Sequence, residues 1–177
     1  MNDQGGSELP PHLRQDPILV ETHPANQGCF EYMKPAKSCP IVVREVAGML
    51  LVLAFRHPLA GCQLVKGTID DGEDAAAAAV RELKEESGVV AEVVSALGIW
   101  PSGHKEQIWS FHLCRPSVAL PETWSHWCHD DCGHDFQFFW HPLMSEPSAD
   151  WHPVHAGALA FVRNVLSRVD EAEESRA

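Results

Sequence analysis

Residues 67–89 read GTIDDGEDAAAAAVRELKEESGV, and this stretch decides the fold. It predicts a helix that Asp74 caps, that a run of five alanines extends and that Gly88 ends. The expected buried stripe of this helix consists of Ala76, Ala79, Val80 and Leu83. The remaining faces are left to charged side chains, so the chemistry of the stretch lies in its acidic residues.

Three glutamates, Glu82, Glu85 and Glu86, share one helix face, because residues three and four apart are neighbours there. Like charges so spaced destabilise a helix by roughly a few tenths of a kcal/mol per pair. A divalent cation bound between them would make the same cluster of carboxylates stabilising. Carboxylate oxygens suit Mg²⁺ or Mn²⁺. Seven acidic and two basic residues give residues 70–86 a net charge of −5, so a phosphate substrate needs bridging metal ions. A solvated face of mixed charge explains the glutamates alone equally well.

The spacing of the stretch favours the metal interpretation. It matches the pattern Gly-x5-Glu-x7-Arg-Glu-U-x-Glu-Glu-x-Gly-U, with U apolar, at every defined position. The matching residues are Gly67, Glu73, Arg81, Glu82, Leu83, Glu85, Glu86, Gly88 and Val89. This pattern is the Nudix box, and the chain resembles the Nudix hydrolase family. The order of strands and helices over residues 40–169 is similar to the family's α/β/α sandwich with a mixed central sheet, so an α/β fold is expected.

The resemblance implies a pyrophosphohydrolase that cleaves a nucleoside diphosphate linked to another moiety, by attack of water at phosphorus. It implies Mg²⁺ or Mn²⁺ as the cofactor, bound by Glu82, Glu85, Glu86 and the carbonyl group of Gly67. Arg81 would orient the carboxylates. The base that takes the proton from water would be Glu82 or Glu86, and the resemblance does not choose between them.

Further roles follow from the resemblance. Glu73 would tie the loop to the helix, and Gly88 would have a structural role at the helix end. Lys66 resembles the lysine before the box in several dinucleoside-polyphosphate hydrolases and would contact a phosphate, although a solvated lysine explains it as well. Many family members add a later acidic metal ligand, for which the candidates are Glu106, Asp130, Asp131 and Asp135.

The chain is predicted to form one domain. The expected parts are a flexible leader at residues 1–16, a single Nudix hydrolase domain at 17–170 and an acidic tail at 171–177. Besides the quoted helix, the pattern predicts a hairpin over 40–46 and 49–55, strands at 63–66, 89–100, 107–114 and 136–141, and a helix over 150–169. No internal repeat or long linker divides this sequence.

The composition of the chain limits the kinds of partner that it is expected to bind. The 177 residues carry 13 basic and 25 acidic side chains, a net charge of −12 that argues against nucleic acid as a partner. The longest apolar run, 46–55, is half the length of about 20 residues that a membrane-spanning helix needs. With no secretory signal, we expect a cytoplasmic protein that binds a small nucleotide derivative and no membrane. A homodimer is left open.

Alternatives concern function and a second metal. The runner-up is a non-catalytic Nudix module that senses a nucleotide, against which the intact box argues. An isopentenyl-diphosphate isomerase would need a Thr-Cys-Cys-Ser-His-Pro stretch that this sequence lacks. Residues 126–134, HWCHDDCGH, contain the ligand types of a zinc site, but three residues separate the cysteines where two are usual. A polar loop with free thiols is the simpler interpretation.

Overall fold

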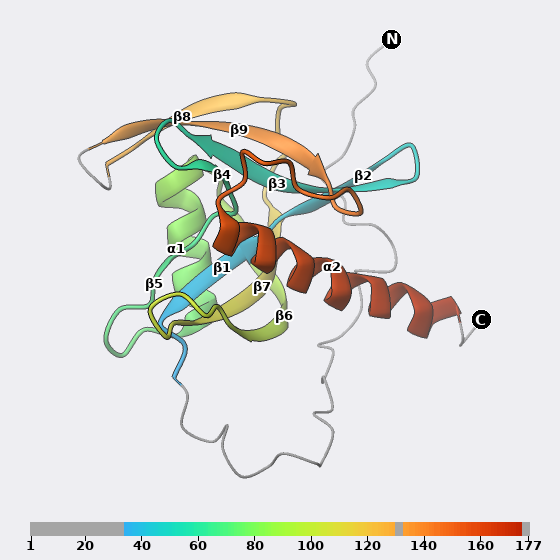
Figure 1. Ribbon diagram of the computed structural model, residues 1–177, viewed down its shortest axis with the longest axis horizontal. Coiled ribbons are helices and arrows are strands. Elements are labelled where there is room, and N and C mark those ends of the chain that lie inside the picture. Colours follow the sequence, from blue (N-terminus) through green and yellow to red (C-terminus); the bar gives the residue numbers. More distant parts are fainter. Residues whose placement is uncertain (1–33, 130–132, 175–177) are drawn as a thin grey trace.

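The computed structural model describes residues 34–129 and 133–174, and side chains up to residue 168 (Figure 1). The strands are β1 (Lys37–Ile41), β2 (Val43–Val46), β3 (Met49–His57), β4 (Gly61–Gln63), β5 (Gly67–Thr68), β6 (Ala91–Pro101), β7 (Ile108–Pro116), β8 (Trp124–Cys128) and β9 (His134–Pro142), and the helices are α1 (Ala75–Ser87) and α2 (Pro153–Glu174). The leader expected at residues 1–16 and the last residues of the expected tail lie outside the described residues.

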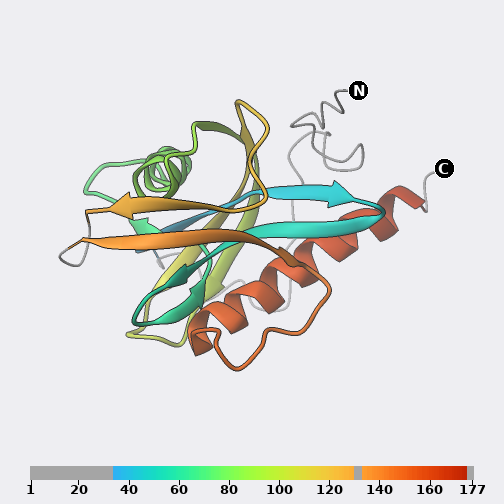
Figure 2. The ribbon, with the colours of Figure 1, turned by 90° about the horizontal axis from the view of Figure 1, so that it is seen from above.

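Two sheets lie between the helices. The first has the order β5-β1-β7-β6 and is mixed, because β1 runs parallel to β7 while the other pairs are antiparallel. The second has the order β2-β3-β9-β8, with β4 added to β3, and is antiparallel. Figure 2 shows α1 and α2 on opposite sides of the strands. The α/β class with a mixed sheet is therefore confirmed, and the second sheet is an addition to it.

The interior has two apolar clusters, one for each helix. On the α1 side, Leu83 packs with Phe55 and Phe138 of the second sheet. On the α2 side, Leu159 and Val162 pack with aromatic residues of β7. Cysteine side chains are buried in these clusters, namely Cys39, Cys62, Cys114 and Cys128. Each helix covers one side of the strands, so removing either would expose an apolar layer.

Helix α1 begins and ends where the sequence predicts. The Asp74 carboxylate accepts hydrogen bonds from the N–H groups of Ala76 and Ala77, at 2.9 and 3.3 Å. Gly88 ends the helix with φ = 75°, a left-handed conformation that glycine adopts without strain. The expected stripe was partly wrong, since Ala76 and Val80 are only partly buried. The buried face is instead Ala78, Ala79, Glu82, Leu83, Glu86 and Ser87, which includes two glutamates.

The strands follow the expectations in part, since β1 lies mostly before the first predicted strand and β5 was not predicted. The predicted hairpin is confirmed as β2 and β3, which pair from Val46 to Met49 across a two-residue turn. The strand expected at 63–66 was wrong beyond its first residue, because β4 ends at Gln63 and the next three residues belong to no strand. Strand β8 was missed, since its alternation of aromatic and polar residues lies in the stretch assigned to a polar loop.

In the part of the chain that the structure describes, neither helix is both long and apolar enough to cross a membrane.

Replacing Asp74 by alanine should lower the free energy of unfolding by about 1 kcal/mol, because two N–H groups at the start of α1 lose their acceptor. Urea denaturation measures the change. The matched control is Asp71→Ala, an exposed aspartate in the same loop. Equal stabilities of the two variants would contradict the capping role.

Candidate active site

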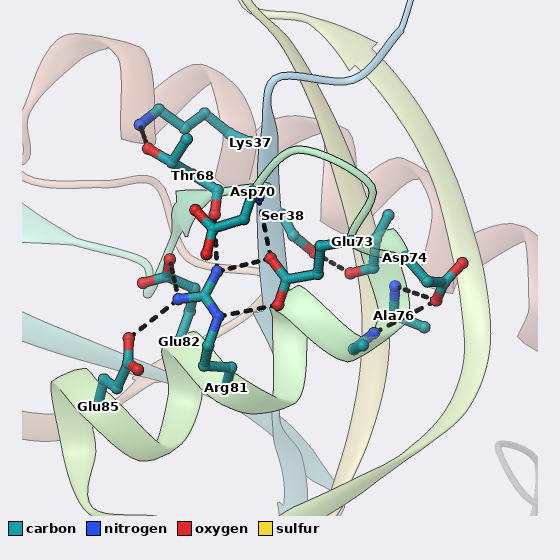
Figure 3. A network of polar contacts seen from close by, with 12 residues as sticks. Lys37, Ser38, Thr68, Asp70, Glu73, Asp74, Ala76, Arg81, Glu82 and Glu85 are labelled. Carbon is teal, nitrogen blue, oxygen red and sulfur yellow. Dashed lines mark hydrogen bonds and ion pairs between the residues drawn. The ribbon is translucent and has the colours of Figure 1, made fainter.

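Arg81 lies at the centre of the polar network shown in Figure 3. Its Nε and Nη2 atoms donate to the two carboxylate oxygens of Glu73, at 2.9 and 2.8 Å. Nη2 also donates to the carbonyl oxygen of Thr68, at 2.8 Å. The second Glu73 oxygen accepts from the N–H of Asp70, at 3.0 Å. Arg81 and Glu73 thus fix the loop between β5 and α1, the tie that the resemblance implies for Glu73.

The third nitrogen of the Arg81 guanidinium faces two glutamates of the helix. Nη1 donates to Glu82 at 2.8 Å and to Glu85 at 3.0 Å. These carboxylates, with that of Glu73, raise the pKa of Arg81 above its usual range. One cation therefore bonds three carboxylates, so their mutual repulsion is partly cancelled.

Two carboxylates of the site are removed from water. Glu82 is 5% exposed and Glu86 8% exposed, whereas the side chain of Glu85 is 54% exposed. Glu82 reaches the interior because Gly67 has no side chain: a Cβ atom at that position would lie 1.6 Å from the Glu82 carboxyl carbon. Any larger residue at 67 would displace this carboxylate, and the glycine of the box is therefore a steric requirement here.

The donor set fits a hard divalent cation in its chemistry. Three carboxylates and the backbone of Gly67 supply oxygen and no sulfur. As the described side chains stand, no three His, Cys, Asp or Glu residues form a group that could hold a metal ion. Glu82 and Glu85 are instead turned to the guanidinium of Arg81. These carboxylates therefore already interact with one cation, and a metal would have to share them with it.

Two lysines, Lys37 and Lys66, lie near the box. Lys37 of β1 is paired in register with Thr68 and donates to its hydroxyl oxygen at 2.5 Å. Burial, then the positive charge of Lys66, lowers the pKa of Lys37, while Glu82 and Glu86 act in the opposite direction. Lysines and carboxylates are therefore near neighbours. The sequence pattern points to Lys66 but not to Lys37, because only the pairing of β1 with β5 brings residue 37 to the box.

The C-terminal end of α1 is held by β8. His126 Nε2 lies 3.1 Å from the carbonyl oxygen of Glu85, and Trp124 Nε1 donates to that of Ser87 at 3.0 Å. A Cβ atom on Gly88 would lie 3.0 Å from the His126 ring. Gly88 therefore ends the helix and leaves room for this histidine.

The further metal candidates do not join the network among the described residues. Glu106 is exposed in the loop before β7. Asp135 is exposed and adjacent to Phe136, whose side chain packs in the α1-side cluster, so Asp135 points to the opposite face of its sheet. Asp130, Asp131 and Cys132 lie outside the described residues. Of the residues weighed as zinc ligands in the alternative interpretation of 126–134, Cys128 is buried in the core.

The fold and the site define an α/β protein with a carboxylate site on its first helix, at the edge of a mixed sheet. The family model described as the NUDIX domain matches residues 34–161. The chain belongs to this family.

Curated relatives match over shorter stretches. An ADP-ribose pyrophosphatase of Methanocaldococcus jannaschii is 33% identical over 76 residues, which are 42% of this chain and 45% of that protein. An RNA pyrophosphohydrolase of Dinoroseobacter shibae is 39% identical over 92 residues, 51% of this chain and 53% of that protein. The chain thus spans about half the length of these relatives.

Solved structures agree in fold. An ADP-ribose pyrophosphatase from Streptococcus suis superposes with a TM-score of 0.53 and 17% identity, over 72% of this chain and 88% of that one. A UDP-X diphosphatase gives 0.56 and 13%, over 80% of this chain and 67% of that one. At such identities the likeness concerns the fold alone.

Stability should depend on pH through Glu73. Hydrogen bonds from Arg81, then from the Asp70 N–H, lower the pKa of Glu73 from 4.5 to about 2. Its contribution to the free energy of unfolding is therefore present above pH 4.5 and is lost as the pH falls towards 2. We expect Glu73→Gln to be less stable than the wild type at pH 7 and to approach it at pH 3 in denaturation curves. Glu45→Gln, at an exposed position of β2, is the control. If the difference in unfolding free energy between wild type and Glu73→Gln were the same at pH 7 and pH 3, Glu73 would not be the group responsible.

Proposed function

We propose that the protein is a Mg²⁺- or Mn²⁺-dependent pyrophosphohydrolase that cleaves a nucleoside diphosphate linked to another moiety. The observation that carries this proposal is the burial of two helix carboxylates, Glu82 and Glu86, beside a glycine that makes room for one of them. Burying a carboxylate is costly unless a positive group is close. The same residues are those that the Nudix box assigns to the metal.

The proposed metal ligands are Glu82, Glu85, Glu86 and the carbonyl group of Gly67. A divalent cation bound there would supply charge neutralisation at the phosphates and polarisation of the phosphorus centre. Arg81 holds Glu82 and Glu85 by hydrogen bonds and so fixes the direction in which their remaining oxygens point. Glu82 or Glu86 takes the proton from the attacking water.

Lys37 and Lys66 supply the positive charge for the substrate in this proposal. Both are partly buried, and the positive charge of Lys66 acts on Lys37. Two ammonium groups beside acidic side chains suit a chain of phosphates that must approach carboxylates. They would contact the phosphate oxygens that do not bind the metal.

The substrate is proposed to be a small nucleotide derivative such as ADP-ribose. The named activities of the relatives, on ADP-ribose in one and on RNA in the other, both involve a pyrophosphate bond. The net charge of −12 would repel a polyanionic RNA chain more than a dinucleotide. We therefore rank the small molecule first, and RNA with a 5′-triphosphate is the comparison.

Glu86→Gln should lower the turnover number at least about 100-fold, because the site loses a charged ligand or the base. The panel is ADP-ribose, NADH, nucleotide sugars, dinucleoside polyphosphates and 5′-triphosphate RNA, each with Mg²⁺ or Mn²⁺. The measurement is the inorganic phosphate that a coupled phosphatase frees from the monoester products, or that a coupled pyrophosphatase frees from pyrophosphate in the case of RNA. Wild type should also gain thermal stability from the metal, since a ligand of the native state stabilises it.

The control for this series is Glu92→Gln, an exposed glutamate that pairs with Arg115. It should keep wild-type turnover. Near wild-type turnover of Glu86→Gln would remove Glu86 from the site. Silence of the wild type on the whole panel, with the metal still raising the melting temperature, would favour the nucleotide-sensing alternative over hydrolysis.

Lys37→Gln should raise KM about tenfold with a smaller change in kcat, equivalent to about 1.4 kcal/mol of lost substrate binding. The reason is the loss of one ammonium group beside the proposed phosphate path. Steady-state kinetics on the best substrate of the panel measures it. Lys105→Gln, in an exposed loop, is the matched control. An unchanged KM would show that Lys37 does not face the substrate.

A further inference from the structure

A buried histidine of α2 reaches the segment that leads into the box. His155 is 2% exposed, and its Nδ1 atom accepts the N–H of Leu64 at 3.1 Å. Leu64 comes three residues before Gly67. The bond crosses 91 positions of sequence, and it joins the second helix to the backbone that carries Lys66 and Gly67.

The loop before α2 is fastened to the same segment. The N–H of Cys62 donates to the carbonyl oxygen of Asp150 at 2.8 Å, and the N–H of His152 donates to that of Cys62 at 3.0 Å. Gly61 permits this approach, because a Cβ atom there would lie 2.2 Å from the Asp150 carbonyl oxygen. The Asp150 carboxylate also pairs with Arg56 at 2.7 Å. Residues 61–64 are thus held from the side of α2.

The side chain of His155 also borders the surroundings of Lys66. Its ring lies 5.2 Å from that of Trp109, centroid to centroid, and the Lys66 ammonium lies 5.9 Å from the same Trp109 ring. Burial, and then the charges of Lys66 and His152, lower the pKa of His155 to about 2. The imidazole is therefore neutral, and its Nδ1 remains an acceptor.

We infer that His155 is a positioning residue of the Nudix site, which holds the extended 64–67 segment so that Lys66 and the Gly67 carbonyl group face the glutamates of α1. The inference rests on the proposed function, because it assigns His155 to the same metal and substrate site. Residues 64–66 belong to no strand, so the Leu64 N–H takes its hydrogen bond from outside the sheet, at His155. Metal ligands are commonly oriented by such outer contacts.

The chemistry of the bond selects the test variants. An asparagine oxygen can take the place of Nδ1, whereas a glutamine oxygen lies nearer the position of Nε2. His155→Asn should therefore keep the acceptor, and His155→Gln should lose it at similar polarity. His152→Asn is the matched control, because His152 begins the same helix region and no hydrogen bond joins its ring to the segment.

The measurement is the Mg²⁺ concentration that gives half of the maximal rise in melting temperature, which requires no turnover. We expect His155→Gln to need about tenfold more Mg²⁺ than the wild type, and His155→Asn and His152→Asn to stay within about twofold. Asp150→Ala, at an exposed position, removes the carboxylate that pairs with Arg56 and accepts from the Cys62 thiol, while the backbone bond between Cys62 and Asp150 remains. This variant should also need more Mg²⁺ than the wild type for half of the maximal rise in melting temperature. If His155→Gln does not fold, Asp150→Ala takes its place as the test of the inference.

The outcomes separate this inference from the function it rests on. If the wild type responds to Mg²⁺ and all variants share its midpoint while only the metal-free melting temperature falls, His155 is structural and the inference is wrong. If the wild type itself shows no response to Mg²⁺ or Mn²⁺, the proposed function fails, and the inference fails with it.

Discussion

The constraint on which the site depends is the burial of two glutamate side chains in the interior. Glu82 and Glu86 lie on the buried face of α1, where the loss of hydration costs several kcal/mol for each charge, roughly. Arg81 offsets part of this cost, because its guanidinium has enough donors for Glu82, Glu85 and Glu73 at once. A lysine has one point charge in place of this planar set of donors, so arginine suits the position.

This network also organises the backbone around it. Arg81 bonds the Thr68 carbonyl group at the end of β5, and Glu73 bonds the Asp70 N–H in the following loop. Helix α1 therefore fixes the residues that follow Gly67, while α2 fixes the residues that precede it, through Leu64. The two helices lie on opposite sides of the strands, and both form hydrogen bonds to the short segment around Gly67 (Figures 1 and 2). The packing of helices and sheets therefore positions the backbone of the site.

The part of this arrangement that could be predicted is local in sequence. The caps at Asp74 and Gly88, and the ring of carboxylates around Arg81, depend on spacings within one helix and its preceding loop. The apolar residues alone could not predict which face of α1 is buried. Glu82 is buried because Gly67 has no side chain and leaves room for the carboxylate. Lys37 and His155 required strand pairing and helix packing across long sequence separations, and no local pattern marks either residue.

The buried thiols of the core have a consequence for its dynamics. Burial raises the pKa of Cys62 to about 11 and that of Cys114 to about 12, so little thiolate forms at neutral pH. Cys62 lies at the fastening of β4 to the loop before α2, and Cys114 lies in the α1-side cluster. Modification of either thiol requires local opening. The rates at which a thiol reagent modifies Cys62 and Cys114 therefore report how readily each side of the sandwich opens locally.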